Sequence, residues 1–160
     1  MERDNMSKVL RQTWIQADPS DIWAILVALD QFPEWEGGYV AASYVGGQRY
    51  GVGTRRQVRL RSPMGVRKAL HEITKWDENK QIAWRAVESN FPMLASAEQT
   101  VTLVPEGAGT RVDNLVEYQL SGGPVGRFMD RIMFNRVVVG ANEGFVAALK
   151  KAAESLKSGD

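Results

Sequence analysis

Three side chains in this 160-residue sequence have the chemistry of a catalytic or ligand-binding group: His71, Arg56 and Tyr118. His71 is the only histidine, and an imidazole can donate or accept a proton near neutral pH. Arg56 could stabilise an anionic or enol-like oxygen, and Tyr118 could act as a second proton donor. We treat all three as candidate catalytic groups. The alternative for His71 is a structural histidine bonded to backbone or water.

The residue types that the chain lacks narrow the chemistry. It contains no cysteine, which excludes disulfides, thiolate zinc sites, iron–sulfur clusters and cysteine nucleophiles. One histidine is too few for the usual histidine-rich metal sites. We therefore expect no metal and no cofactor.

The composition is typical of one folded domain. Hydrophobic residues make up 44% of the chain and charged residues 24%, and the formal net charge is +1, which by itself favours neither DNA nor a membrane. The N-terminus lacks a secretory signal, and no uninterrupted apolar run reaches the roughly 20 residues of a membrane span. The sequence predicts one cytoplasmic domain over residues 8–156, with flexible termini at 1–7 and 157–160 and no integral membrane segment.

Turn residues and hydrophobic periodicity predict the elements that position these groups. A strand over residues 9–16 precedes two short helices, which end near Leu29 and Glu36. Six strands follow at hairpin spacing, and one long helix runs from Pro124 to about Leu156. The predicted fold class is α+β: a curved seven-stranded antiparallel sheet whose concave face is covered by the C-terminal helix. The predicted later strands span residues 39–45, 54–61, 66–76, 81–88, 97–104 and 111–120.

Hairpin geometry predicts which side chains share the concave face. A four-residue loop at 62–65 sets the first register, and the next hairpin closes at Trp76 and Gln81. The expected pairs are Arg56–His71, Val58–Ala69, Ile73–Trp84, Gln99–Val116, Val101–Asn114 and Leu103–Val112. Directly opposed residues lie on the same side of a sheet. The predicted apolar face is Val58, Leu60, Ile73, Ile82, Trp84, Val101, Leu103, Val112, Val116 and Tyr118.

The order of these elements and several short stretches resemble the SRPBCC/START-like superfamily, specifically its polyketide cyclase/dehydrase-type members with the helix-grip (Bet v 1/START-like) fold. The similar stretches are 15–23 (IQADPSDIW), 32–35 (FPEW), 51–54 (GVGT), 76–77 (WD) with 82–85 (IAWR), 109–112 (GTRV) and 122–127 (GGPVGR). They cover nearly the whole chain in the family's order. The superfamily includes lipid carriers, hormone receptors and aromatase/cyclases, so the resemblance implies the fold and leaves the ligand open.

Polar residues on the inner face favour a wet cavity over a dry core. The long helix adds a seam at three- and four-residue spacing: Phe128, Ile132, Asn135, Val139, Asn142, Val146 and Leu149. The inward polar set is Arg56, His71, Gln99, Asn114, Tyr118, Asn135 and Asn142. Seven buried polar groups are many for a core of this size, unless they bond one another or lie at its edge. The predicted ligand contacts are Val58, Ile73, Trp84, Gln99, Val101, Asn114, Val116, Phe128, Ile132, Asn135, Val139 and Asn142.

Two surface features remain open. The hairpin 55–68 holds six basic residues and no acidic one, which indicates either a solvated surface or a contact for an anionic partner such as RNA, lipid headgroups or an acidic carrier protein. Arg56 itself either extends to the cavity mouth or awaits an anionic ligand oxygen. The apolar segments 91–94 and 128–134 could form a gate for the ligand, a homodimer contact or ordinary core.

Two functional hypotheses follow. The first is a carrier or sensor that binds a hydrophobic small molecule, such as a lipid, quinone or polyketide, between the sheet and the C-terminal helix. The second, implied by the resemblance, is an aromatase/cyclase-like enzyme in which Arg56 stabilises an enolate and His71 or Tyr118 moves protons. Binding is favoured over catalysis because the sequence shows no unmistakable pair of acid and base groups.

Overall fold

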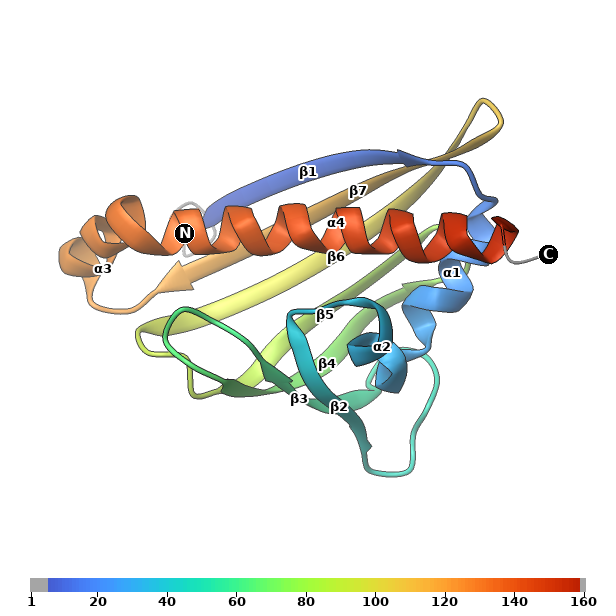
Figure 1. Ribbon diagram of the computed structural model, residues 1–160. Helices are drawn as coiled ribbons and strands as arrows, with labels where there is room; N and C mark the ends of the chain where they lie inside the picture. The colour runs from blue at the N-terminus through green and yellow to red at the C-terminus, as the bar shows by residue number, and fades with distance from the viewer. Residues whose placement is uncertain (1–5, 159–160) are drawn as a thin grey trace.

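A seven-stranded antiparallel sheet curls around one long helix in the computed structural model, which describes residues 6–158 (Figure 1). The strands lie in the order β1-β7-β6-β5-β4-β3-β2. This is the predicted topology, with the two short helices between β1 and β2. The elements are β1 (Ser7–Ile15), α1 (Pro19–Val27), a 3₁₀ turn (Leu29–Gln31), α2 (Phe32–Trp35), β2 (Tyr39–Val45), β3 (Arg55–Leu60), β4 (Arg67–Asp77), β5 (Gln81–Ser89), β6 (Leu94–Glu106), β7 (Gly109–Leu120), α3 (Gly123–Met129), a π-helical turn (Asp130–Phe134) and α4 (Asn135–Ser158).

The ends of the chain differ slightly from the expected bounds. β1 begins at Ser7 and α4 ends at Ser158, so both elements reach into the segments 1–7 and 157–160 that the sequence predicts as flexible. The remaining parts of those segments, residues 1–5 and 159–160, lie outside the described residues.

The predicted strand registers are confirmed. Arg56 pairs with His71, Ile73 with Trp84, and Val101 with Asn114. One detail differs: the β4–β5 hairpin closes at Asp77–Gln81 instead of Trp76–Gln81. A bulge in β4 between Ile73 and Lys75 takes up the extra residue. On the side of the bulge away from the turn, Ile73 therefore still pairs with Trp84.

The inner face of the sheet forms the core together with α1, α2 and α4. Eight of the ten predicted inner residues are buried, and Leu60 and Val116 are half-buried. Phe32 of α2 lies fully buried among the rings of Tyr39, Trp84 and Phe145. The sequence therefore predicts correctly which side of β3 to β7 is removed from water.

The helical seam is only partly as predicted. Phe128 and Ile132 are 60% and 50% exposed, whereas Phe134 and Phe145, which the predicted seam omits, are buried. The π turn Asp130–Phe134 explains the exposure of Phe128 and Ile132. It holds one residue more than an α-helical turn, so the preceding residues are rotated by about 100° relative to a continuous α-helix.

By length and composition alone, the helical stretch Gly123–Leu156 could cross a membrane. In this fold its second half has a different role. Asn142, Phe145, Val146 and Leu149 are buried against the sheet and α1, so α4 is the core helix of the domain.

Candidate ligand cavity

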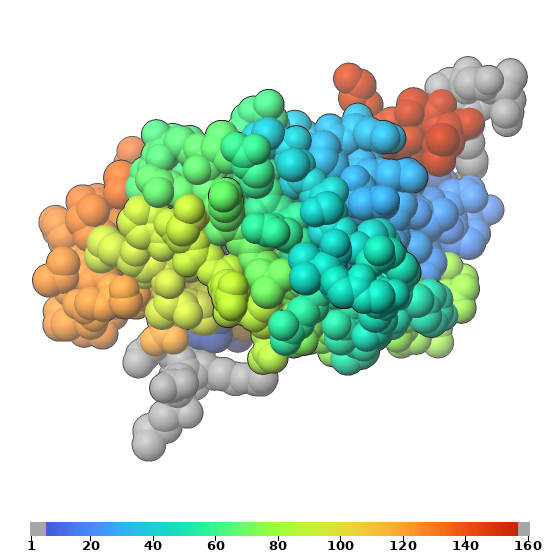
Figure 2. Space-filling model, turned by 90° about the horizontal axis from the view of Figure 1, so that it is seen from below, coloured from blue at the N-terminus to red at the C-terminus, as the bar shows by residue number. Residues whose placement is uncertain are grey.

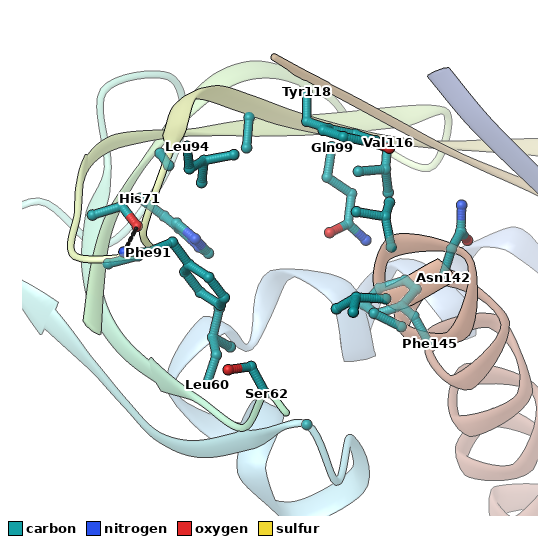
Figure 3. Close-up of a pocket in the computed structure, with 18 of the residues that line it drawn as sticks. Leu60, Ser62, His71, Phe91, Leu94, Gln99, Val116, Tyr118, Asn142 and Phe145 are labelled. Carbon is teal, nitrogen blue, oxygen red and sulfur yellow. Dashed lines mark hydrogen bonds between the residues drawn. The ribbon is translucent and has the colours of Figure 1, made fainter. Parts of the chain in front are cut away.

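A cavity of about 230 Å³ lies between α4 and the concave face of the sheet. Most of its wall is apolar, with Trp84 and Val116 from the sheet and Val138 and Phe145 from α4. Figure 3 shows Leu60, Ser62 and Phe91 on one side of this space, and Val116, Asn142 and Phe145 opposite them. The space is larger than the roughly 150 Å³ cavity that can hold one benzene molecule.

Arg56 is buried behind the cavity wall and does not reach its mouth. Its side chain is 1% exposed, and its guanidinium donates hydrogen bonds to the carbonyl of Leu29 at 3.3 Å and to the hydroxyl of Tyr39 at 3.0 Å. The guanidinium carbon also lies 4.3 Å from the ring centre of Phe32 and 5.0 Å from that of Trp84. Burial lowers the pKa of Arg56, and Tyr39 partly opposes this.

Arg56 has no carboxylate partner among the described residues, in which every ion pair involves other side chains. Aromatic faces and neutral oxygens surround the cation instead. Such faces attract a desolvated guanidinium electrostatically. The sequence-based alternative that Arg56 extends to the mouth is therefore wrong, because its hydrogen bonds hold it in the core.

His71 lines the cavity as a neutral hydrogen-bond donor. Its Nδ1 atom lies 3.4 Å from Nη2 of Arg56. Because a guanidinium can only donate, Nδ1 must accept, and the neutral ring then carries its proton on Nε2. Burial, followed by the positive charge of Arg56, holds the pKa of His71 well below 6.5. Nε2 has no hydrogen-bond partner within residues 6–158, and Figure 3 shows the ring directed into the cavity from β4.

A chain of three amides forms the opposite polar wall. Asn142 donates to the backbone carbonyls of Val9 and Asn114, at 3.0 and 3.1 Å. Its oxygen accepts from Asn114 Nδ2 at 2.7 Å, and Asn114 Oδ1 accepts from Gln99 Nε2 at 2.9 Å. Each bond fixes the orientation of the next amide. Gln99 is thereby left with a free acceptor, Oε1, at the cavity surface (Figure 3).

Tyr118 contributes its ring to the cavity, but its hydroxyl is bound elsewhere. The hydroxyl donates to Asp130 Oδ1 at 2.5 Å and accepts from Asn135 Nδ2 at 3.3 Å. Ser7 donates to the other oxygen of Asp130, also at 2.5 Å. Burial and Asp130 raise the pKa of Tyr118 to about 12. The hydroxyl therefore anchors the π turn to β1 and β7.

The structure separates the predicted ligand contacts into three groups. Those on the cavity wall are Trp84, Gln99, Asn114, Val116 and Asn142, together with His71 and Tyr118. Those buried in the adjoining core are Val58, Ile73 and Val101. Those away from the wall are Phe128, Ile132, Asn135 and Val139. The π turn accounts for Phe128 and Ile132, whereas Asn135 and Val139 follow it on α4.

The predicted ligand contacts omit several residues of the cavity wall, among them Phe145 and Glu36. Phe145 was omitted because the seam was counted from Phe128, although its spacing from Asn142 and Leu149 matches a helical face. Glu36, which follows α2, also lines the cavity. Burial raises the pKa of Glu36, and the Gly38 N–H, which donates to Oε1 at 2.9 Å, partly opposes this.

A curled antiparallel sheet that grips a C-terminal helix around a mainly apolar cavity defines the START/Bet v 1 class of helix-grip proteins. Residues 6–154 match the family described as polyketide cyclase / dehydrase and lipid transport, and the chain belongs to that family. The predicted superfamily and fold are thereby confirmed. Comparison with the curated proteins found no significant match.

Three solved structures illustrate the similarity. An aromatase/cyclase, ZhuI from Streptomyces sp. R1128, has a TM-score of 0.82 at 13% identity, with 93% of this chain and 94% of that chain covered. A START superfamily protein from Mycobacterium smegmatis has a TM-score of 0.78 at 16% identity, covering 93% and 98%. A protein from Thermus thermophilus has a TM-score of 0.79 at 19% identity, covering 94% and 99%. At such identities the similarity shows the fold alone.

Family membership supports binding of a hydrophobic ligand or a polyketide cyclase role in this fold. The cytoplasmic location, the homodimer contact and the anionic partner at hairpin 55–68 stay predictions.

Proposed function

We propose that this protein is a non-catalytic carrier or sensor that holds a hydrophobic small molecule in the cavity between the sheet and α4. The apolar wall supplies affinity through the removal of ligand surface from water. The few polar groups on the wall orient the ligand.

The observation that carries this proposal is that the atoms of the three candidate groups that a cyclase would use as an oxyanion donor, a base and an acid are engaged with other protein groups. Arg56 bonds to Leu29, Tyr39 and His71 behind the wall, and the hydroxyl of Tyr118 bonds to Asp130. The lone pair of His71 that could act as a base is used to accept from Arg56. A cyclase needs a group that gains and loses protons during each turnover. These contacts favour binding over the polyketide cyclase alternative.

The free polar atoms define the chemistry of the ligand. His71 offers a donor at Nε2, which fits a carbonyl or hydroxyl oxygen. Gln99 offers an acceptor at Oε1, which fits a hydroxyl or N–H. We expect an uncharged molecule with an apolar body larger than one benzene ring and with polar groups at separate positions along it. Lipid-, quinone- and polyketide-like compounds fit this description.

A pair of alanine substitutions on α4 tests the proposal. Both alanines are exposed on the same helix, but Ala141 lines the cavity, whereas Ala147 lies off its wall. Ala141→Phe should fill the cavity and weaken binding of the neutral probe N-phenyl-1-naphthylamine at least tenfold, measured by fluorescence titration. Ala147→Phe should leave the probe affinity unchanged. Native mass spectrometry of freshly purified protein should show a retained small molecule that Ala141→Phe loses.

Equal probe affinity in the two variants would contradict a ligand in this cavity. Turnover of a poly-β-keto substrate that His71→Gln reduces by orders of magnitude, with binding intact, would support the cyclase instead.

A further inference from the structure

The helical segment before α4 presents large apolar side chains to solvent. Val125, Phe128, Ile132 and Met133 are 65%, 60%, 50% and 38% exposed. We call these four residues the α3 patch. The first three recur at three- and four-residue spacing and therefore share one helix face. Contiguous exposed apolar groups of this kind mark interaction surfaces more often than isolated ones do.

Contacts on the opposite side of the segment keep the patch outward. Gly126 is buried, and a Cβ atom at this position would lie 2.3 Å from the backbone oxygen of Ser121. Asp130 accepts hydrogen bonds from Tyr118 and Ser7. The segment is thus held by its Gly126–Asp130 side and cannot turn the α3 patch toward the core.

Three arginines accompany the α3 patch: Arg127, Arg131 and Arg136. All are exposed, and none forms a side-chain hydrogen bond or ion pair within residues 6–158. Asp130 is the one acidic residue between positions 121 and 136, and its oxygens accept from neutral hydroxyls. The segment therefore combines unpaired positive charge with apolar surface.

The basic hairpin 55–68 is a weaker candidate for an anionic partner, because most of its cations are already engaged. Arg55 forms an ion pair with Glu72 at 3.1 Å, and Arg56 is buried. Arg61 and Arg67 donate to backbone carbonyls, each at 2.7 Å. Only Arg59 and Lys68 of its six basic side chains lack such a contact in the described part of the chain.

The α3 patch lies beside the β5–β6 loop, at the end of the molecule where that loop lines the cavity. The N–H of Ser121, just before α3, donates to the carbonyl of Met93 in the β5–β6 loop at 2.7 Å. Phe91 and Leu94 of that loop, and Phe134 at the end of the π turn, line the cavity. Figures 1 and 2 show α3 and the β5–β6 loop together at this end.

We propose that this surface docks on an anionic lipid bilayer. The α3 patch enters the boundary between headgroups and acyl chains, and Arg127, Arg131 and Arg136 contact lipid phosphates. Short amphipathic segments that join large apolar residues to unpaired arginines bind membranes in this way, through apolar burial together with attraction to anionic lipids. The arrangement places the end of the cavity that Phe91 and Leu94 line toward the bilayer. Docking through the α3 patch does not require a ligand in the cavity.

Vesicle sedimentation of the full chain tests this inference. The protein should bind vesicles of phosphatidylcholine mixed with phosphatidylglycerol and should bind pure phosphatidylcholine much more weakly. Binding should weaken as NaCl rises from about 0.1 M to 1 M, because the Debye length falls from about 10 Å to 3 Å. R127Q/R131Q/R136Q should reduce the affinity for vesicles roughly 100-fold. Each arginine near an anionic surface raises the affinity about fivefold, and the variant removes three. F128S/I132S should reduce binding even to the anionic vesicles.

Matched controls separate the α3 patch from general charge and general hydrophobicity. R55Q/R59Q/K68Q removes the same charge from the hairpin 55–68, and V52S/V66S removes exposed apolar groups elsewhere. Both controls should bind vesicles as the unmodified chain does. Absence of vesicle binding, or equal losses in controls and α3 variants, would overturn the inference. So would a dimer, seen by analytical ultracentrifugation, that F128S/I132S dissociates while vesicle binding is absent. Titration of the same variants with N-phenyl-1-naphthylamine measures ligand binding in the cavity separately from vesicle binding.

Discussion

Arg56 and His71 face each other across β3 and β4, and the 3.4 Å contact from Nη2 to Nδ1 fixes the tautomer of the only histidine in the chain. The arginine acts on the cavity through this ring, since it does not itself line the cavity wall. A buried cation behind a neutral imidazole strengthens the Nε2–H as a donor. The pair therefore favours recognition of a ligand oxygen.

Stability should depend on pH through His71. Its pKa is held well below 6.5 in the folded protein, so as the pH falls the unfolded chain takes up a proton first. The stabilisation is complete above pH 6.5. It is lost below that value by up to about 1.4 kcal/mol per pH unit, until the folded pKa is reached. Urea denaturation at a series of pH values measures this slope.

His71→Gln should flatten the slope between pH 5 and about 6.5, where the single histidine is the expected source. Glu36 acts with the opposite sign at lower pH, because its raised pKa gives stability below 4.5 that is lost as the pH rises through the folded value. A slope that is unchanged in His71→Gln would contradict a buried, neutral histidine.

Removal of the arginine charge should raise the pKa of His71. In Arg56→Met the repulsion from the guanidinium disappears, while burial, the larger cause, remains. We expect a pKa higher than in the unmodified protein but still below 6.5. The single imidazole resonance in a proton NMR titration measures it directly. Arg59→Met, which changes an exposed side chain on the same strand, should leave the pKa where it was.

The amide chain should contribute strongly to stability. Asn142→Leu leaves Asn114 Nδ2 and the carbonyls of Val9 and Asn114 without their partner, which should cost about 3 kcal/mol. Gln99→Leu removes one half-buried contact and should cost about 1 kcal/mol. Chemical denaturation of both variants measures whether Asn142→Leu lowers the free energy of unfolding more than Gln99→Leu does. Equal costs would mean that the amides are hydrated in the folded state.

Two glycines in the C-terminal helical region should respond oppositely to alanine. Gly126→Ala places a Cβ atom 2.3 Å from the backbone oxygen of Ser121 and should destabilise the protein by about 1–3 kcal/mol. Gly140→Ala meets no atom within 4 Å in the middle of α4 and should stabilise it by about 0.5–1 kcal/mol. Thermal unfolding of the two variants compares them. A loss of stability in Gly140→Ala as well would contradict the open space at this position of α4.

The fold was largely predictable because its information is local. The side chains of a strand alternate with a period of two residues, so one correct turn fixes the faces of both strands in a hairpin. The loop 62–65 alone places Arg56 opposite His71, as observed. The bulge near Thr74 was not predictable in this way, since the sequence around it contains no glycine or other turn signal.

The site was less predictable, because it depends on how distant elements meet. The π turn is invisible in the hydrophobic pattern, and it decides that Phe128 and Ile132 face solvent. Glu36 reaches the cavity only because α2 packs beside β2.

The amino-acid sequence by itself determined the strand faces, the polar residues on them and the family, because all three follow from short-range spacing. Tertiary structure decided what those polar residues do. Arg56 became an internal donor, Tyr118 an anchor for Asp130, and His71 a donor on the cavity wall. Hydrogen-bond partners are chosen by three-dimensional proximity in a medium without water, and no period along the chain encodes that choice.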